Sequence, residues 1–167
     1  MKLRIPILAI ISSMILGCAG LQPAPESELT FERVVDAPGF TKDQLFEASK
    51  VWIAQNFRSA KAVLEYENKA EGKIIGNGII NYPCDGIECL GKSDWSAHFT
   101  MQVDIKDQKF KLAFSNLRIS WPPKYPNAGF EGSVRSQGDL DSIKPALLKF
   151  GDQMAASMRK TKSGANW

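Results

Sequence analysis

The stretch WSAHFTMQVDIKDQKFKLAF (residues 95–114) decides the fold. From Trp95 to Lys106, apolar and polar residues alternate strictly, which is typical of a β-strand with one buried face. A two-residue turn at Asp107-Gln108 pairs apolar residues across the hairpin: Ile105 with Phe110, Val103 with Leu112 and Met101 with Phe114. The sequence therefore predicts an antiparallel hairpin with one buried face.

The parity of this pattern changes after Ser115, where the apolar residues become Leu117, Ile119 and Trp121. The change predicts either a β-bulge near Ser115-Asn116 or a strand end that is apolar on both faces. The same register places His98, the only histidine, on the polar face. Since the pattern brings no acidic or nucleophilic partner to it, we expect His98 to be solvated and not catalytic.

Three further strands are predicted on the N-terminal side of the hairpin. The first covers residues 29–36 and ends at the Pro38-Gly39 turn, and the other two cover residues 62–68 and 73–82. Gly76 and Gly78 lie on one face of the third of these strands, where they permit close backbone approach by a helix or a partner.

Two helices complete the pattern. Thr41 and Gln44 form a capping box for the first helix. Its apolar face is expected to cover the sheet, with Trp52 as a core anchor, and comprises Leu45, Ala48, Trp52 and Phe57, with Val51 and Ile53 at its margins. The second helix follows from the stripe Ile143, Leu147, Phe150, Met154 and Met158. We expect Asp141 or Ser142 to cap it, with Pro145 in its first turn.

This element order predicts an α+β fold, β-α-β-β-β-β-α, with an antiparallel sheet and two helices packed on one face. One domain is expected over residues 29–160, followed by a C-terminal tail over 161–167. The chain resembles the DUF4468 domain family in several segments: residues 35–39, 41–46, Trp52, residues 56–60 and residues 71–78. The resemblance covers roughly residues 29–120. It implies a TBP-like fold, no established activity, and membership of a group found mostly in lipoproteins and other exported bacterial proteins.

The N-terminus has the features of an export signal. Lys2 and Arg4 precede an apolar run over residues 5–16, and Gly17-Cys18 follows, which predicts a signal peptide over residues 1–17. The junction resembles a bacterial lipobox, in which Cys18 would be the lipidated residue. Residues 18–28 are then the lipidated cysteine and a flexible linker whose last ten residues reach at most about 35 Å. The resemblance implies attachment to the cell membrane, and Ala19 favours the outer membrane of a Gram-negative host.

The remaining cysteines, Cys84 and Cys89, form the only other pair in the chain. In an oxidising compartment an isolated pair that closes a short loop predicts a disulfide. A metal site would need more ligands, and the spacing does not match that of a zinc site. We expect no metal and no cofactor.

Charge and motifs argue against nucleic acid binding and catalysis. The 167-residue chain carries a net charge of +3, of which Lys2 and Arg4 supply two, so the remainder is close to neutral. A nucleic-acid-binding face would need clustered Lys and Arg. No Gly-x-Ser-x-Gly or His-Glu-x-x-His motif is present, and we expect the protein not to be an enzyme.

A surface is the better functional candidate. The connection over residues 121–138 is long and rich in aromatic residues and proline, and Trp121, Tyr125 and Phe130 are candidate anchors for an envelope protein. The alternative for this segment is that its rings pack against the sheet edge. The sequence thus favours a protein-binding or structural module. A small-ligand carrier is the alternative, and it would require an apolar cavity of some hundreds of Å³ between helices and sheet.

Overall fold

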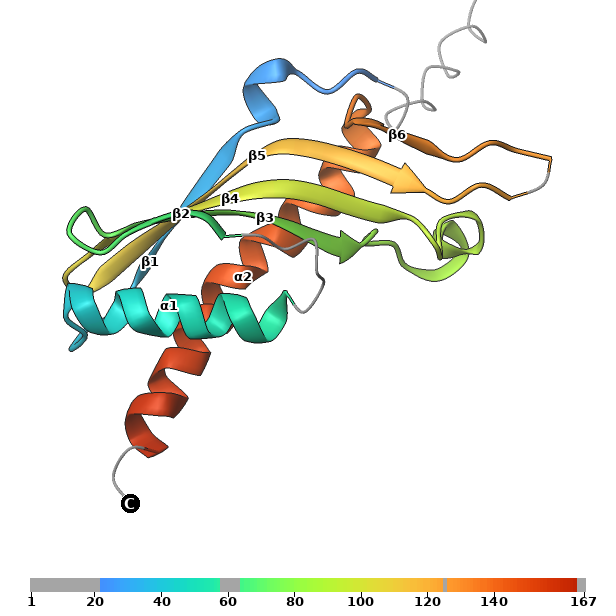
Figure 1. Ribbon diagram of the computed structural model, residues 1–167. Helices are drawn as coiled ribbons and strands as arrows, with labels where there is room; N and C mark the ends of the chain where they lie inside the picture. The colour runs from blue at the N-terminus through green and yellow to red at the C-terminus, as the bar shows by residue number, and fades with distance from the viewer. Residues whose placement is uncertain (1–21, 58–63, 125, 165–167) are drawn as a thin grey trace, which may run out of the picture.

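A six-stranded antiparallel sheet with both helices on one face makes up the fold (Figure 1). The computed structural model describes residues 22–57, 64–124 and 126–164. The elements in chain order are η2 (Glu26–Glu28), β1 (Phe31–Asp36), α1 (Lys42–Asn56), β2 (Leu64–Asn68), β3 (Lys73–Asn81), η3 (Gly86–Gly91), β4 (Ser96–Lys106), β5 (Lys109–Trp121), β6 (Phe130–Ser133) and α2 (Gln137–Gly164). The strand order is β1-β5-β4-β3-β2, and β6 also pairs with β5. The predicted α+β class is confirmed.

The β4–β5 hairpin has the register predicted from its alternation. Its apolar pairs are Ile105 with Phe110, Val103 with Leu112 and Met101 with Phe114. The predicted bulge is also present, because Thr100 pairs with Ser115 whereas His98 pairs with Arg118. Phe99 therefore faces two residues of β5, and one of them, Asn116, has a φ of 52°. The extra residue returns Leu117 and Ile119 to the buried face.

One strand is missing from the predicted order. The connection over residues 121–138 contains β6, which pairs with the last four residues of β5, whereas β1 pairs with residues 109–114 of the same strand. β1 and β6 thus lie end to end along one edge of β5. The four residues of β6 are too few, and too close to proline and glycine, for their periodicity to predict a strand. The strand forms because β5 is long enough to pair with β6 as well as with β1.

Aromatic rings fill the space between the helices and the sheet. α1 begins with the predicted capping box, and the Trp52 side chain is 3% exposed. Contacting ring centroids lie 5.5 to 6.2 Å apart in a cluster of Trp52, Phe57, Phe99, Phe114 and Phe150. The Phe99 ring lies over Gly78, where a Cβ atom would come within 2.4 Å of the ring Cζ. The space above Gly78 is therefore taken by a ring of the neighbouring strand, and not by the backbone of a helix or partner as expected.

α2 starts earlier and ends later than its apolar stripe predicts. The Ser136 hydroxyl accepts a hydrogen bond from the Asp139 backbone N–H at 3.1 Å, so Ser136 caps the helix, and the expected caps Asp141 and Ser142 lie inside it. Pro145 is likewise in the helix interior and not in its first turn. The helix continues to Gly164, so the predicted tail over residues 161–167 is helical in its first part. The apolar stripe predicts too late a start for α2, because polar contacts and not apolar packing hold the first turn of the helix.

The expected linker is attached to the fold over its described part. Pro23 forms an antiparallel β-bridge with Ser136, and the Ala24 N–H donates to the Arg135 carbonyl at 2.8 Å. The Gln137 N–H donates to the Gln22 carbonyl at 2.7 Å. The expected linker is therefore not flexible over residues 22–24, because their backbone bonds to the β6–α2 junction. The signal residues 1–17 and Cys18 lie outside the described residues.

Within the described ranges, no helix combines the length and apolar character needed to cross a membrane.

Candidate functional site

Two loops that the sequence could not place relative to each other meet at one end of the sheet (Figure 1). One is the disulfide loop, residues 84–91, between β3 and β4, and the other is the turn of the β5–β6 hairpin. The predicted disulfide joins Cys84 and Cys89. The hairpin turn reaches the short segment between the disulfide loop and β4, since the Lys124 ammonium lies 2.9 Å from the Asp94 carboxylate. We call this region the loop end.

Three rings from this end form a continuous stack, which we call the aromatic stack: Trp95, Trp121 and Phe130. Successive ring centroids are 4.4 Å apart with interplanar angles of 20° and 21°. Trp121 is half-buried and Phe130 is 41% exposed, so one ring packs against the sheet while the outer ring faces solvent. The structure thus brings together two of the three predicted anchor residues. The third, Tyr125, lies outside the described residues.

A hollow of about 480 Å³ opens beside the stack. Trp95 and Trp121 form its apolar wall, and Asp94, Lys124 and Asn127 supply its polar groups. A ring next to a few polar groups in a concave surface is an arrangement that binds side chains of a partner protein well.

The disulfide loop adds two exposed apolar side chains that the sequence had not selected. Ile87 is 86% exposed and Leu90 is 84% exposed, more than any other large apolar side chain among the described residues. The signal was present as one aliphatic residue between the two cysteines, Ile87, and a second directly after Cys89, Leu90. It was missed because a loop residue has no periodicity to mark it as exposed.

A polar network attaches this loop to α2. The Tyr82 hydroxyl donates to the Asp139 carboxylate at 2.5 Å, and the Lys92 ammonium donates to both groups at 3.1 and 3.2 Å. The Lys92 ammonium also lies over the Tyr82 and Trp95 rings, 4.5 and 5.1 Å from their centroids. Since Lys92 follows η3 directly, the network fixes the base of the disulfide loop.

The network shifts the pKa of each of its members. Burial alone would raise the pKa of Asp139, but hydrogen bonds from Ser136, Tyr82 and Lys92 outweigh it and lower the pKa. Burial, and then the hydrogen bond to Asp139, raises the pKa of Tyr82. Burial opposes the charge of Lys92, yet its contacts with Tyr82 and Asp139 raise its pKa overall. The ionised pair and the neutral phenol are thus the stable forms at neutral pH.

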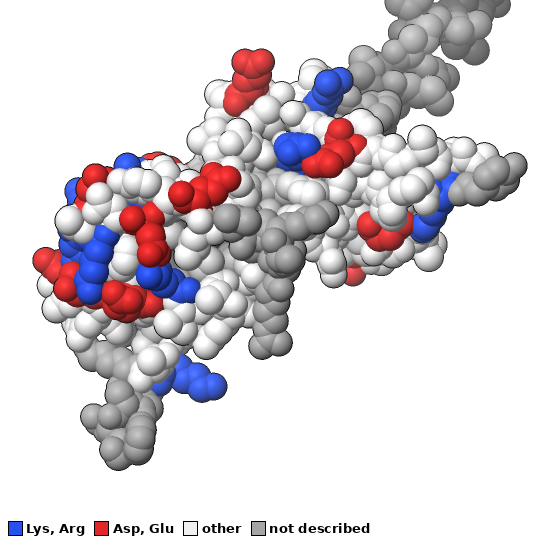
Figure 2. All heavy atoms as spheres, in the orientation of Figure 1, with Lys and Arg blue, Asp and Glu red and all other residues white. Residues whose placement is uncertain are grey.

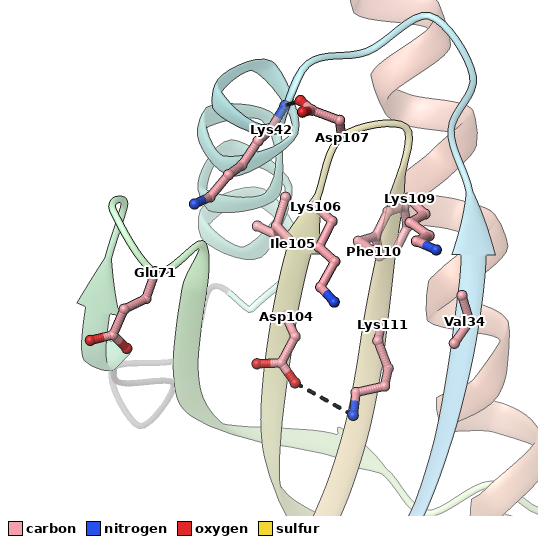
Figure 3. A pocket seen from close by; sticks show the side chains of 10 residues that line it. All are labelled: Val34, Lys42, Glu71, Asp104, Ile105, Lys106, Asp107, Lys109, Phe110 and Lys111. Carbon is pink, nitrogen blue, oxygen red and sulfur yellow. Dashed lines mark hydrogen bonds and ion pairs between the residues drawn. The ribbon is translucent and has the colours of Figure 1, made fainter.

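The opposite end of the sheet holds the most voluminous hollow described, of about 680 Å³ (Figure 3). Lysines and acids alternate around it. Lys111 lies 3.0 Å from Glu32 and 3.6 Å from Asp104, and the Lys42 backbone N–H donates to Asp107 at 2.7 Å. Because lysines and acids both line the hollow, it presents no field of one sign to a ligand.

Two apolar spaces bear on the carrier alternative. The hollow between α1, β3 and β4 measures about 10 Å³, since the aromatic cluster fills that layer. A groove of about 360 Å³ lies instead between α1 and α2, lined by Phe40, Ala48, Val51 and Met158 among others. The space between helices and sheet that the carrier alternative requires is therefore packed, and the larger apolar space lies between the helices.

The open face of the sheet carries a chain of hydrogen bonds. Thr100 donates to Asn77 at 2.7 Å and accepts from Asn116 at 3.1 Å. His98 and Ser120 share a hydrogen bond of 2.7 Å, so His98 is half-buried and bonded within the sheet and not simply solvated. In the described ranges, no three His, Cys, Asp or Glu side chains gather as a metal site would require.

Comparisons with known proteins agree with this architecture. A family model described as "Domain of unknown function (DUF4468) with TBP-like fold" matches residues 31–120. No curated protein matches the chain.

Two solved structures share the fold. A DUF4468 family protein from Bacteroides ovatus ATCC 8483 superposes with a TM-score of 0.56 at 13% identity, over 82% of this chain and 90% of that one. A TBP-like protein from Parabacteroides distasonis ATCC 8503 gives 0.62 at 10% identity, over 82% of this chain and 96% of that one. The resemblance stated from the sequence is confirmed, and because the family model covers more than half of its residues, this chain belongs to the DUF4468 family with a TBP-like fold.

Proposed function

We propose that the protein is a lipid-anchored module of the bacterial cell envelope, without enzymatic activity, that binds another envelope protein through the aromatic stack. The observation that carries the proposal is the stack itself: Phe130 is 41% exposed and lies on Trp121, which packs against Trp95. Aromatic rings that lose little conformational freedom on binding are the usual anchors of protein interfaces. The sheet and the attached disulfide loop hold these rings in place before any partner arrives.

Membrane attachment in this proposal rests on Cys18 and the lipobox resemblance. Two acyl chains on one residue give stable anchoring, whereas one chain gives only reversible binding. Mass spectrometry of the N-terminal peptide, together with a Cys18→Ser variant, tests the anchor. Release of the Cys18→Ser variant from the membrane fraction is the expected result.

Binding is tested by placing the photo-crosslinking amino acid benzoylphenylalanine at position 130 in the full-length protein in cells. The matched control carries it at Val34, which is 57% exposed on the open face of β1. We expect a discrete protein adduct at position 130 that is absent at position 34. Equal labelling at the two positions, or no protein adduct at position 130, would contradict the proposal.

The groove between α1 and α2 favours one alternative, a carrier of a small apolar ligand. Its volume of about 360 Å³ is within the range of small-molecule sites. Native mass spectrometry of the protein, compared with an Ala48→Trp variant that fills the groove, distinguishes the alternatives. A ligand mass present in the wild type and lost in the variant would favour the carrier.

A further inference from the structure

The point at which the chain leaves the fold is fixed by backbone hydrogen bonds. The Gln22 carbonyl accepts from Gln137, and Ala24 donates to Arg135. Only the four residue steps from Cys18 to Gln22 then separate a lipid on Cys18 from the folded domain. Fully extended, four residues span at most about 14 Å. The β6–α2 junction is therefore the part of the domain that a lipid on Cys18 would hold closest to the bilayer.

The disulfide loop lies on this same side of the molecule. Ser136, which forms the β-bridge with Pro23, donates to Asp139 at 2.6 Å. Asp139 in turn accepts from Tyr82 and Lys92 at the base of the disulfide loop. One carboxylate thus connects the attachment point of the chain with the loop. Figure 1 shows the N-terminal segment along the β6 edge of the sheet, and the turn of the β5–β6 hairpin and the disulfide loop at one end of the sheet.

The chemistry of the loop suits a lipid surface. Ile87 and Leu90 are 86% and 84% exposed, and the Cys84–Cys89 disulfide closes the loop that carries Ile87. A closed loop loses less conformational freedom when its side chains are buried than an open one does. Trp121 and Phe130 stand beside it, and aromatic rings favour the headgroup region of a bilayer.

The distribution of charge agrees with this orientation. Figure 2 shows side chains of both signs crowded around the end that carries α1 and the β4–β5 turn, and fewer of them toward the loop end. The ionised groups at the base of the loop, Lys92 and Asp139, are paired with each other at 3.2 Å. The loop itself carries two acids in its sequence, Asp85 and Glu88, so the contact is with the hydrated interface of the bilayer and not with its hydrocarbon core.

From these observations we infer that the disulfide loop is a second membrane contact, in which Ile87 and Leu90 enter the interface of the bilayer that holds Cys18. This inference rests on the lipid anchor of the proposed function. The two contacts would hold the domain with its loop end toward the membrane. The aromatic stack would then lie at the level of the bilayer surface, so its protein partner would be one that is embedded in the membrane or lies on it.

The test places benzoylphenylalanine at position 90 of the full-length, lipidated protein in native membranes, followed by irradiation and mass analysis. The control position is Val34, an apolar side chain of β1 that is 57% exposed. We expect phospholipid adducts at position 90, none at position 34, and loss of the adducts at position 90 in the Cys18→Ser variant. Since Leu90 is solvent-exposed, its replacement leaves the fold intact, which circular dichroism verifies.

Two results would overturn the inference. Protein adducts alone at position 90 would assign the loop to a partner protein, and the absence of any lipid adduct in lipidated protein would leave the loop in water. The mass of the N-terminal peptide from the same sample tests the lipid anchor independently of the membrane contact of the loop. An unmodified Cys18 refutes the anchor and the inference with it, whereas a lipidated Cys18 without adducts refutes the inference alone.

Discussion

Gly78 permits the central packing contact of the aromatic cluster. The Phe99 ring occupies the space above it, so a methyl group there would come within 2.4 Å of the ring. We expect Gly78→Ala to destabilise the fold by about 1–3 kcal/mol, because the ring must move within a packed core. A lower urea midpoint at unchanged m-value is the measurement.

Gly91 supplies the control for this substitution. A Cβ atom at Gly91 would meet nothing within 4 Å, and Gly91→Ala is expected to change the free energy of unfolding by less than about 0.5 kcal/mol. Equal effects at the two positions would mean that the Phe99 ring is not confined above Gly78.

Asp139 makes stability depend on pH in a definite direction. Its carboxylate side chain is 16% exposed, and its pKa lies below the ordinary value of Asp. A lowered pKa in the folded state contributes stability above the unfolded-state pKa of about 3.9, and that stability is lost as the pH falls through the folded-state pKa. At pH 7 we expect Asp139→Asn to cost about 1–3 kcal/mol, since it removes the ionised partner of Lys92 and Tyr82.

Urea denaturation at pH 7 and at pH 3 measures this dependence. The difference between wild type and variant should shrink at the lower pH, because below about pH 3.9 the unfolded state binds a proton that the folded state binds only at its own lower pKa. Asp141→Asn is the control, because Asp141 is exposed and accepts a hydrogen bond only from the Gln137 side chain. A constant difference across this pH range would contradict the role given to the Asp139 charge.

Among the elements, α2 offers a direct test of the corrected helix start. Ser136→Ala removes the side chain that accepts from the Asp139 N–H, and it should cost about 1 kcal/mol in thermal or urea unfolding. Ser142→Ala removes no cap: it removes a hydrogen bond to the Gly138 carbonyl within the helix and a contact with the Tyr82 hydroxyl, and it should cost less. A larger loss of stability for Ser142→Ala than for Ser136→Ala would support the later helix start that the apolar stripe predicted.

The elements found from the sequence are those whose own residues encode them. The β4–β5 hairpin has three apolar pairs in register, and the Thr41–Gln44 capping box marks the start of α1. β6 and the start of α2 were not predicted, because residues distant in the chain stabilise them. β6 pairs with β5, and Asp139 in the first turn of α2 accepts hydrogen bonds from Tyr82 and Lys92. The local spacing of apolar residues does not predict such long-range contacts.

The candidate site was likewise predicted only in part from the sequence. Composition identified the aromatic segment and the cysteine pair, which are chemically conspicuous. Their meeting at one end of the sheet followed only from the fold, through the stacking of Trp95 on Trp121. The exposure of Ile87 and Leu90 is likewise a property of the assembled loop, since aliphatic residues are more often buried.

At the scale of the whole molecule, the attachment of residues 22–28 determines how the domain can be held. Hydrogen exchange measures it directly, because the N–H groups of Ala24 and Gln137 are both hydrogen-bonded across the junction. We expect protection of peptides covering residues 22–28 in the full-length protein. Exchange at the rate of an unstructured chain would show that this segment is a free linker. The ten residues after Cys18 could then extend to the predicted maximum of about 35 Å.

The way in which β1 and β6 share one edge of β5 has a consequence for self-association. Two short strands, separated at the bulge near Asn116, replace one long straight border, and the opposite border is β2, a five-residue strand with its own register shift. Within the described residues the sheet therefore offers an incoming strand no long uninterrupted row of free backbone groups. Copies crowded side by side would meet such borders often, and strand-by-strand growth into fibres would be discouraged at each encounter.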